Sequence, residues 1–152
     1  MNEHAEFVLM KAPSLLEKLE KDTPARWGQM NAQQMLEHII LTVKIANGKL
    51  DPGLGISQEE AEKKKELLLS DRLFERNMHN PLMPAKPRPA HYPSFEDARN
   101  KLLNELEDMK AFMREHSGAM PVHPLFGALT LEEWLLFHHN HIMHHFSQFG
   151  LI

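Results

Sequence analysis

The chain has 152 residues, of which 42% are hydrophobic and 25% charged, and it contains no cysteine. This ordinary globular composition excludes extended disorder and fibrous repeats, and the lack of cysteine excludes disulfide scaffolds, iron–sulfur clusters and thiol nucleophiles. Seventeen Lys and Arg against 21 Asp and Glu give a net charge of −4, which is not the basic balance that nucleic-acid binding needs.

A membrane-spanning helix needs about 18 consecutive apolar residues, and no stretch of the chain approaches that length. The first residues are acidic and lack the apolar core of a signal peptide. We therefore expect a cytoplasmic protein that binds neither nucleic acid nor a membrane.

Apolar residues at helical spacing predict a first helix over about residues 6–22, with Pro13 either kinking it or marking its start. The second predicted helix has the clearest boundaries. Asn31 occupies the N-cap position with Gln34 three residues later, which is a capping-box arrangement, and Gly48 follows as the stop.

Three further helices are predicted. Residues 57–74 form one that begins with a Ser cap and carries a charged run, so we expect it at the periphery. Five prolines within residues 77–93 exclude a helix or central strand and predict an extended crossover. Residues 94–116 and 130–149 then form the last two helices, each opened by a Ser or Thr cap with an acidic residue at the third position.

Strand signals are nearly absent, because the chain shows neither alternating apolar runs nor hairpin turns bracketed by them. The fold class is therefore predicted to be all-α: a four-helix bundle with one long Pro-rich crossover, forming a single domain over residues 1–152.

The chain contains 11 histidines, and five of them lie in the last predicted helix. At about 100° per residue, His141 and His145 point off one face, and His138 lies one turn before them on the same side. His139 faces nearly the opposite way and His144 lies to one side, so we expect these two to be solvated, to support a ligand or to lie at a contact surface.

Two imidazoles at positions i and i+4 of a helix are close enough to bind one divalent ion. A third ligand must come from another element, and His38 is the candidate because it lies in mid-helix among apolar residues of its own face. Considered alone, His38 also fits a hydrogen-bonded core histidine, and the pair fits a structural role. The remaining histidines are expected at the surface or in loops: His4, His79, His91, His116 and His123.

Other metal chemistries lack their required residues. A zincin needs Glu after the first His of the pair, where this chain has Ile142, and a di-iron bundle needs Glu-x-x-His on two helices, which is absent. No nucleophile elbow or phosphate-binding glycine loop is present. The remaining option is a mononuclear site of three imidazoles with open positions for water or substrate.

Two blocks, residues 27–38 and 123–148, resemble the DinB-like (DinB/YfiT) superfamily and within it the uncharacterised DUF1569 branch. This resemblance implies a four-helix bundle that binds a metal between helices through His38, His141 and His145. Characterised relatives include thiol-dependent transferases and isomerases in which the metal activates the thiol, and homodimers are common. Their thiol-pocket residues have no match in this chain.

The functional hypothesis is a protein that binds a divalent transition metal, with zinc or nickel expected. As an enzyme it would act on a small molecule, by thiol S-transfer first and hydrolysis second, with His138 as the acid/base group. The alternative is a non-catalytic bundle whose histidines or metal only stabilise the fold. Other neighbours that could orient a ligand or line the pocket, or be capping and core residues, are Gln34, Gln148, Trp134, Met35 and Phe137.

Overall fold

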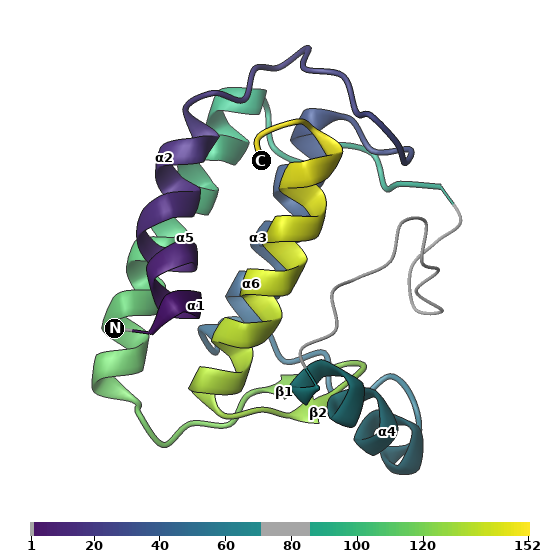
Figure 1. Cartoon of the computed structure of the whole chain (residues 1–152), viewed down its shortest axis with the longest axis vertical. Coiled ribbons are helices and arrows are strands. Elements are labelled where there is room, and N and C mark those ends of the chain that lie inside the picture. The colour runs from purple at the N-terminus through teal and green to yellow at the C-terminus, as the bar shows by residue number, and fades with distance from the viewer. Residues whose placement is uncertain (1, 71–85) are drawn as a thin grey trace.

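The described residues, 2–70 and 86–152 of the computed structural model, are mostly helical (Figure 1). A continuous N-terminal helical segment is followed by four separate helices and one short hairpin. The elements in chain order are α1 (Glu3–Glu6), η1 (Phe7–Lys11), α2 (Ala12–Leu16), α3 (Ala32–Ala46), α4 (Gln58–Leu69), α5 (Phe95–Glu115), β1 (Val122–His123), β2 (Gly127–Ala128) and α6 (Leu131–Gln148).

The N-terminal helix differs from the prediction at both ends, because it begins at Glu3 and ends at Leu16 rather than near residue 22. Pro13 neither breaks nor starts it. The preceding turn is widened into the π-helix η1, in which the Ala12 N–H bonds the Phe7 carbonyl. Pro13 then lies in the first turn of α2, where its missing N–H and its ring are tolerated.

The predicted starts of the other four helices are confirmed, because each begins directly after a side-chain cap. The capping residues are Asn31, Ser57, Ser94 and Thr130, and each accepts a hydrogen bond from a backbone N–H three residues later. The third predicted helix is observed to Leu69, and residues 71–74 of its predicted range lie outside the described part of the chain. Residues 77–85 of the predicted crossover lie outside the described part of the chain, and residues 86–93 form neither helix nor strand.

One element was not predicted. β1 pairs antiparallel with β2, with Val122 opposite Ala128 and His123 opposite Gly127. Gly127 has φ +76°, a left-handed conformation that favours glycine. Two-residue strands are too short to show alternation in sequence, so the hairpin was missed. The described chain is mostly helical, which agrees with the predicted all-α class.

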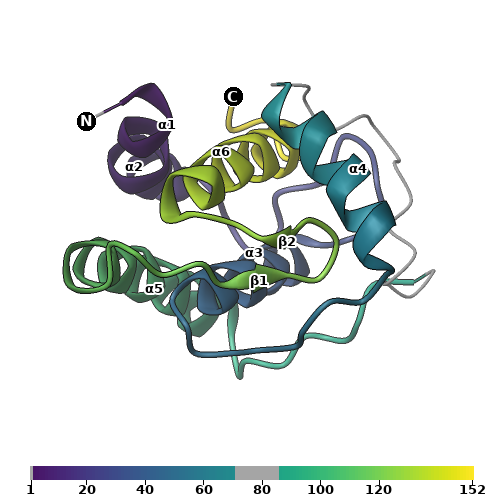
Figure 2. The same cartoon turned by 90° about the horizontal axis from the view of Figure 1, so that it is seen from below.

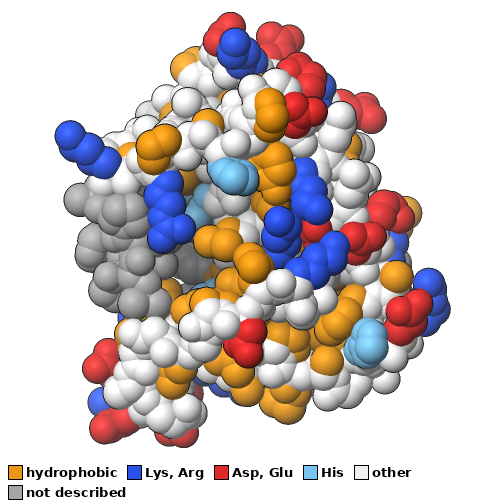
Figure 3. Space-filling view, turned by 180° about the vertical axis from the view of Figure 1, so that it is seen from behind, with side chains coloured by type: hydrophobic (Ala, Val, Ile, Leu, Met, Phe, Trp, Pro, Cys, Tyr) orange, Lys and Arg blue, Asp and Glu red, His pale blue; other side chains and the backbone are white. Residues whose placement is uncertain are grey.

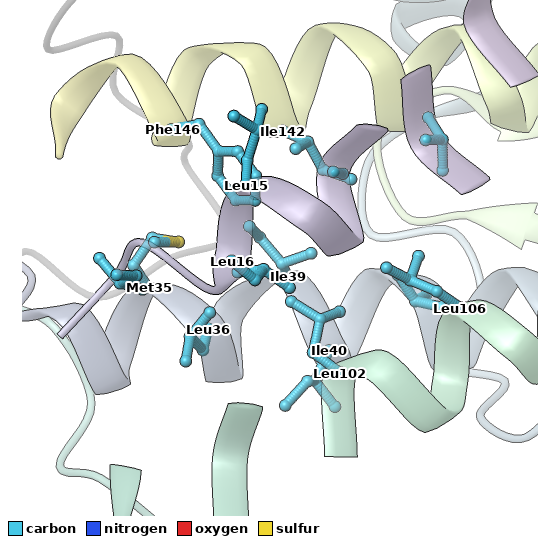
Figure 4. Close-up of a cluster of buried hydrophobic side chains, with 14 of the residues drawn as sticks. Leu15, Leu16, Met35, Leu36, Ile39, Ile40, Leu102, Leu106, Ile142 and Phe146 are labelled. Carbon is cyan, nitrogen blue, oxygen red and sulfur yellow. The ribbon is translucent and has the colours of Figure 1, made fainter. Parts of the chain in front are cut away.

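The N-terminal helix, α3, α5 and α6 pack around one hydrophobic core, with α4 and the hairpin outside it at one end (Figures 1 and 2). Side chains from all four helices meet in the core (Figure 4), among them Leu15, Leu16, Met35, Leu36, Ile39, Ile40, Leu102, Leu106, Ile142 and Phe146. α4 buries only Ala61 and Leu68, which agrees with its predicted peripheral position. Among residues 2–70 and 86–152, no helix is long and apolar enough to cross a membrane.

The end of α3 is tied to α5 by a buried carboxylate. The Glu105 side chain has no exposed surface, and its oxygens accept hydrogen bonds from Lys49 (2.9 Å) and Asn47 (3.1 Å) and pair with Lys101 (2.9 Å). Burial acts to raise the pKa of Glu105, but the hydrogen bonds from Lys101, Lys49 and Asn47 outweigh it and lower the pKa.

Candidate metal centre

Three histidines from two neighbouring helices converge. His38 lies in the middle of α3, and His141 and His145 lie one turn apart on the face of α6 that packs against α3. The Nε2 atom of His141 is 2.9 Å from Nε2 of His38 and 3.1 Å from Nε2 of His145. Nitrogens bound to one zinc ion at about 2.0–2.1 Å lie within about 4.2 Å of each other. The two separations from His141 meet that limit, and the candidate ligand atoms of all three rings lie within 4.8 Å of one another, so a small approach of His38 and His145 would complete the group.

The three neutral rings do not supply enough N–H groups to make both Nε2–Nε2 contacts ordinary hydrogen bonds. Gln148 Oε1 lies 2.7 Å from His145 Nδ1 and can only accept, so Nδ1 carries the proton and Nε2 of neutral His145 has a bare lone pair. The 141–145 contact then needs a proton on His141 Nε2. That single N–H would also have to serve His38, since a protonated ring nitrogen cannot accept. The single proton on His141 Nε2 would therefore have to be shared between Nε2 of His38 and Nε2 of His145. A metal cation placed between the three nitrogens would instead accept a lone pair from each of them.

The surroundings keep the three rings neutral. Burial is the main cause that lowers the pKa of His145 to about 3 and that of His38 to about 4. His38 and His144 add to the effect on His145, and His144 and Arg88 add to the effect on His38. Burial and the neighbouring histidines hold the pKa of His141 well below 6.5. Neutral imidazole is the form that binds metal, so at pH 7 no proton has to be displaced from these rings.

Gln148 and a glycine hold the ligand His145 in place. The loop before α3 packs on the end of α6, where the Arg26 N–H donates to the Gln148 carbonyl (2.6 Å). Gly28 lies against the Gln148 side chain: a Cβ at Gly28 would approach Gln148 Nε2 to 2.8 Å, and its φ of +88° favours glycine. Gln148 therefore fixes the ring of His145, whereas its predicted role of orienting water or a bound ligand stays a prediction. Nothing in the sequence pattern singled out Gly28.

His138 is not one of the converging group. Its side chain has no exposed surface, and neither ring nitrogen has a hydrogen-bond partner among the described residues. It packs against Trp134 and Phe137, with ring centroids 5.4 and 5.5 Å away. Burial lowers its pKa to about 3, so it is neutral at pH 7. Its predicted role as acid/base group stays a prediction.

The prediction that His123 is a surface or loop residue is wrong. His123 is 6% exposed, and its Nδ1 accepts a hydrogen bond from the Leu125 N–H at 3.0 Å. The hairpin folds over the start of α6 and encloses the ring against Phe126, Trp134 and Phe137. Burial lowers its pKa to about 3. No helical period marks this position, so the sequence held no signal for its burial.

Of the residues, besides Gln148, predicted to line the pocket or orient a ligand, one contacts a ligand ring and the others have core or capping roles. Phe137 stacks on the ligand ring of His141, with centroids 4.9 Å apart and an interplanar angle of 26°. Met35 is a plain core residue, and Trp134 donates from Nε1 to the Pro121 carbonyl. Gln34 completes the capping box of α3, and its Nε2 donates to the Arg88 carbonyl at 2.9 Å.

The other histidines are not part of the converging group. His139 is half-buried on the far side of α6, in ring contact with His4, and His144 is half-buried between Trp27 and His145. Two more are exposed, His91 and His116, as predicted. His79 lies outside the described residues.

These features define a mostly helical protein with a candidate metal centre built from three histidines of two packed helices. The chain belongs to the DUF1569 family, described as proteins of unknown function, whose sequence profile matches residues 8–150. All three converging histidines lie within the matched range. No curated protein and no solved structure matches the chain. The DUF1569 part of the resemblance is thereby confirmed, and the DinB-like superfamily stays a prediction.

Proposed function

We propose that this protein is a four-helix bundle of DinB type that binds one divalent transition-metal ion, zinc or nickel, through Nε2 of His38, His141 and His145. The observation that carries the proposal is the convergence of three neutral ring nitrogens that have too few N–H groups to form hydrogen bonds with one another in both contacts. Imidazole donors suit both metals.

The proposed chemistry acts on a small-molecule substrate. When bound, the metal supplies a Lewis acid that favours the thiolate of a thiol or the hydroxide of water, and three protein ligands are typical of catalytic sites that keep a position open. Gln148 fixes the proton of His145 on Nδ1, so its Nε2 faces inward. We favour thiol S-transfer over hydrolysis. His138 is the proposed acid/base group, a role in which the bound substrate must raise its pKa from about 3, the value that burial gives it. A homodimer is part of the same proposal.

Elemental analysis of untagged protein tests the metal site. Wild type is compared with His38→Ala and with the control His116→Ala, which removes an exposed histidine at the end of α5. After incubation with Zn²⁺ or Ni²⁺ and gel filtration, we expect about one equivalent in wild type and control and none in His38→Ala, since two remaining imidazoles bind far more weakly. Far-UV circular dichroism checks that each variant is folded.

Two results would contradict the proposal: full metal stoichiometry in His38→Ala, or none in wild type after incubation. A further measurement separates catalysis from a purely structural metal, which is the alternative function. Cobalt-loaded protein whose visible spectrum changes on addition of 2-mercaptoethanol has a coordination position open to a thiol. An unchanged spectrum would favour the structural alternative.

A further inference from the structure

Residues 88–92, the described end of the crossover, are hydrogen-bonded along α3, the helix that carries His38. Gln34, one turn before His38, donates from Nε2 to the Arg88 carbonyl at 2.9 Å. Glu37 accepts the backbone N–H groups of His91 (2.7 Å) and Tyr92 (3.1 Å). These bonds hold the backbone from residue 88 to residue 92 against α3, so Arg88 keeps a set position beside the turn that carries His38.

One permanent cation, Arg88, lies within electrostatic range of His38. After burial, the groups that lower the pKa of His38 are His144 and Arg88, so both lie within electrostatic range of the ligand ring. Glu37, the acidic neighbour of His38 in sequence, has its carboxylate engaged by the crossover amides. Figure 3 shows one face of the molecule, on which Lys and Arg side chains and a histidine lie among hydrophobic side chains.

The three-histidine ligand set also carries no negative charge. A divalent ion among these imidazoles therefore keeps its full charge, and no carboxylate of the described residues belongs to the group. Arg88 is exposed, which leaves its guanidinium accessible to a molecule arriving from solvent. A planar guanidinium binds carboxylates in a two-pronged geometry that lysine cannot reproduce.

We propose that Arg88 selects substrates that carry a carboxylate, binding it while another atom of the same molecule reaches the metal at His38, His141 and His145. The inference rests on the proposed metal-binding function and specifies its substrate class: small anionic molecules. Arg88 is a binding residue in this scheme. Its backbone is positioned by the hydrogen bond that Gln34 donates to the Arg88 carbonyl and by those that Glu37 accepts from His91 and Tyr92.

The test uses cobalt-loaded protein and two thiols that differ in charge. The probes are 3-mercaptopropionate and 3-mercapto-1-propanol, which share chain length and thiol, and binding is followed by the visible spectrum at pH 8. Wild type is compared with Arg88→Gln, which keeps the backbone carbonyl that Gln34 binds, and with Arg114→Gln, which removes an exposed arginine in the last turn of α5.

We expect wild type and Arg114→Gln to bind the carboxylate thiol at least about fivefold more tightly than the alcohol, a preference that added salt weakens. In Arg88→Gln the two thiols should bind about equally, with cobalt content unchanged. Equal binding in wild type overturns the inference, and so does a preference that survives in Arg88→Gln, because the carboxylate would then act on the metal itself. Loaded protein that responds to neither thiol overturns it while leaving metal binding intact. Failure to take up cobalt refutes the proposed function as well.

Discussion

Metal-free protein should lose stability steeply when the pH falls from 7.5 to 5.5. The cause is a set of buried histidines that stay neutral in the native state but protonate when the chain unfolds. Burial lowers the pKa to about 4 for His38 and to about 3 for His123, His138 and His145. The pKa of His141 is shifted in the same direction.

The size of the effect follows from proton linkage. An unfolded histidine has a pKa of about 6.5, so at pH 5.5 about nine in ten unfolded rings carry a proton that the native ring lacks. Each such ring lowers the free energy of unfolding by about 1–2 kcal/mol at pH 5.5, and the four together by roughly 4–8 kcal/mol. Because the unfolded chain binds more protons, stability is highest above about pH 7 and falls through this window. The lowered pKa of Glu105 matters only at more acid pH, near and below its ordinary value of 4.5.

Urea unfolding followed by circular dichroism, with a chelator present, measures the effect. With an urea slope of about 2 kcal/mol per molar, the midpoint should fall by about 2 M or more between pH 7.5 and 5.5. His138→Leu should reduce this fall by about a fifth, since His141 contributes as a fifth buried ring. It should leave stability at pH 7.5 equal or higher, because it removes two buried nitrogens that lack partners. The control His116→Ala should behave as wild type. A midpoint that moves by less than about 0.5 M would refute the reasoning.

Three further variants test single contacts. Gln148→Ala frees His145 Nδ1 and should weaken metal affinity about 10- to 100-fold in competition with a chromogenic chelator; unchanged affinity would show that Gln148 does not position this ligand. Gly28→Ala forces a left-handed alanine against Gln148 and should cost about 1–2 kcal/mol, seen as a lower thermal midpoint. Glu105→Ala removes the carboxylate that joins α3 to α5 and should cost about 2–3 kcal/mol by urea unfolding, whereas exposed Glu107→Ala should change stability by less than about 0.5 kcal/mol.

The helix starts could be predicted because a cap acts locally. Asn31, Ser57, Ser94 and Thr130 each bind an N–H three residues away, so the residues that decide the start are adjacent in sequence. The fate of Pro13 could not be predicted, because a π turn and a break are both compatible with the local sequence and packing of the N-terminal helix on the core selects between them.

The candidate site shows the same division. The i, i+4 spacing alone places His141 and His145 on one face of a helix, because helical geometry fixes it. Their meeting with His38 depends on α3 packing against α6, which the sequence indicated only through an apolar mid-helix position and a family resemblance. The burial of His123, the contact of Gly28 with Gln148 and the position of Arg88 were decided by the tertiary structure alone. Each depends on segments far apart in the chain, and no local pattern encodes which distant segment a residue will contact.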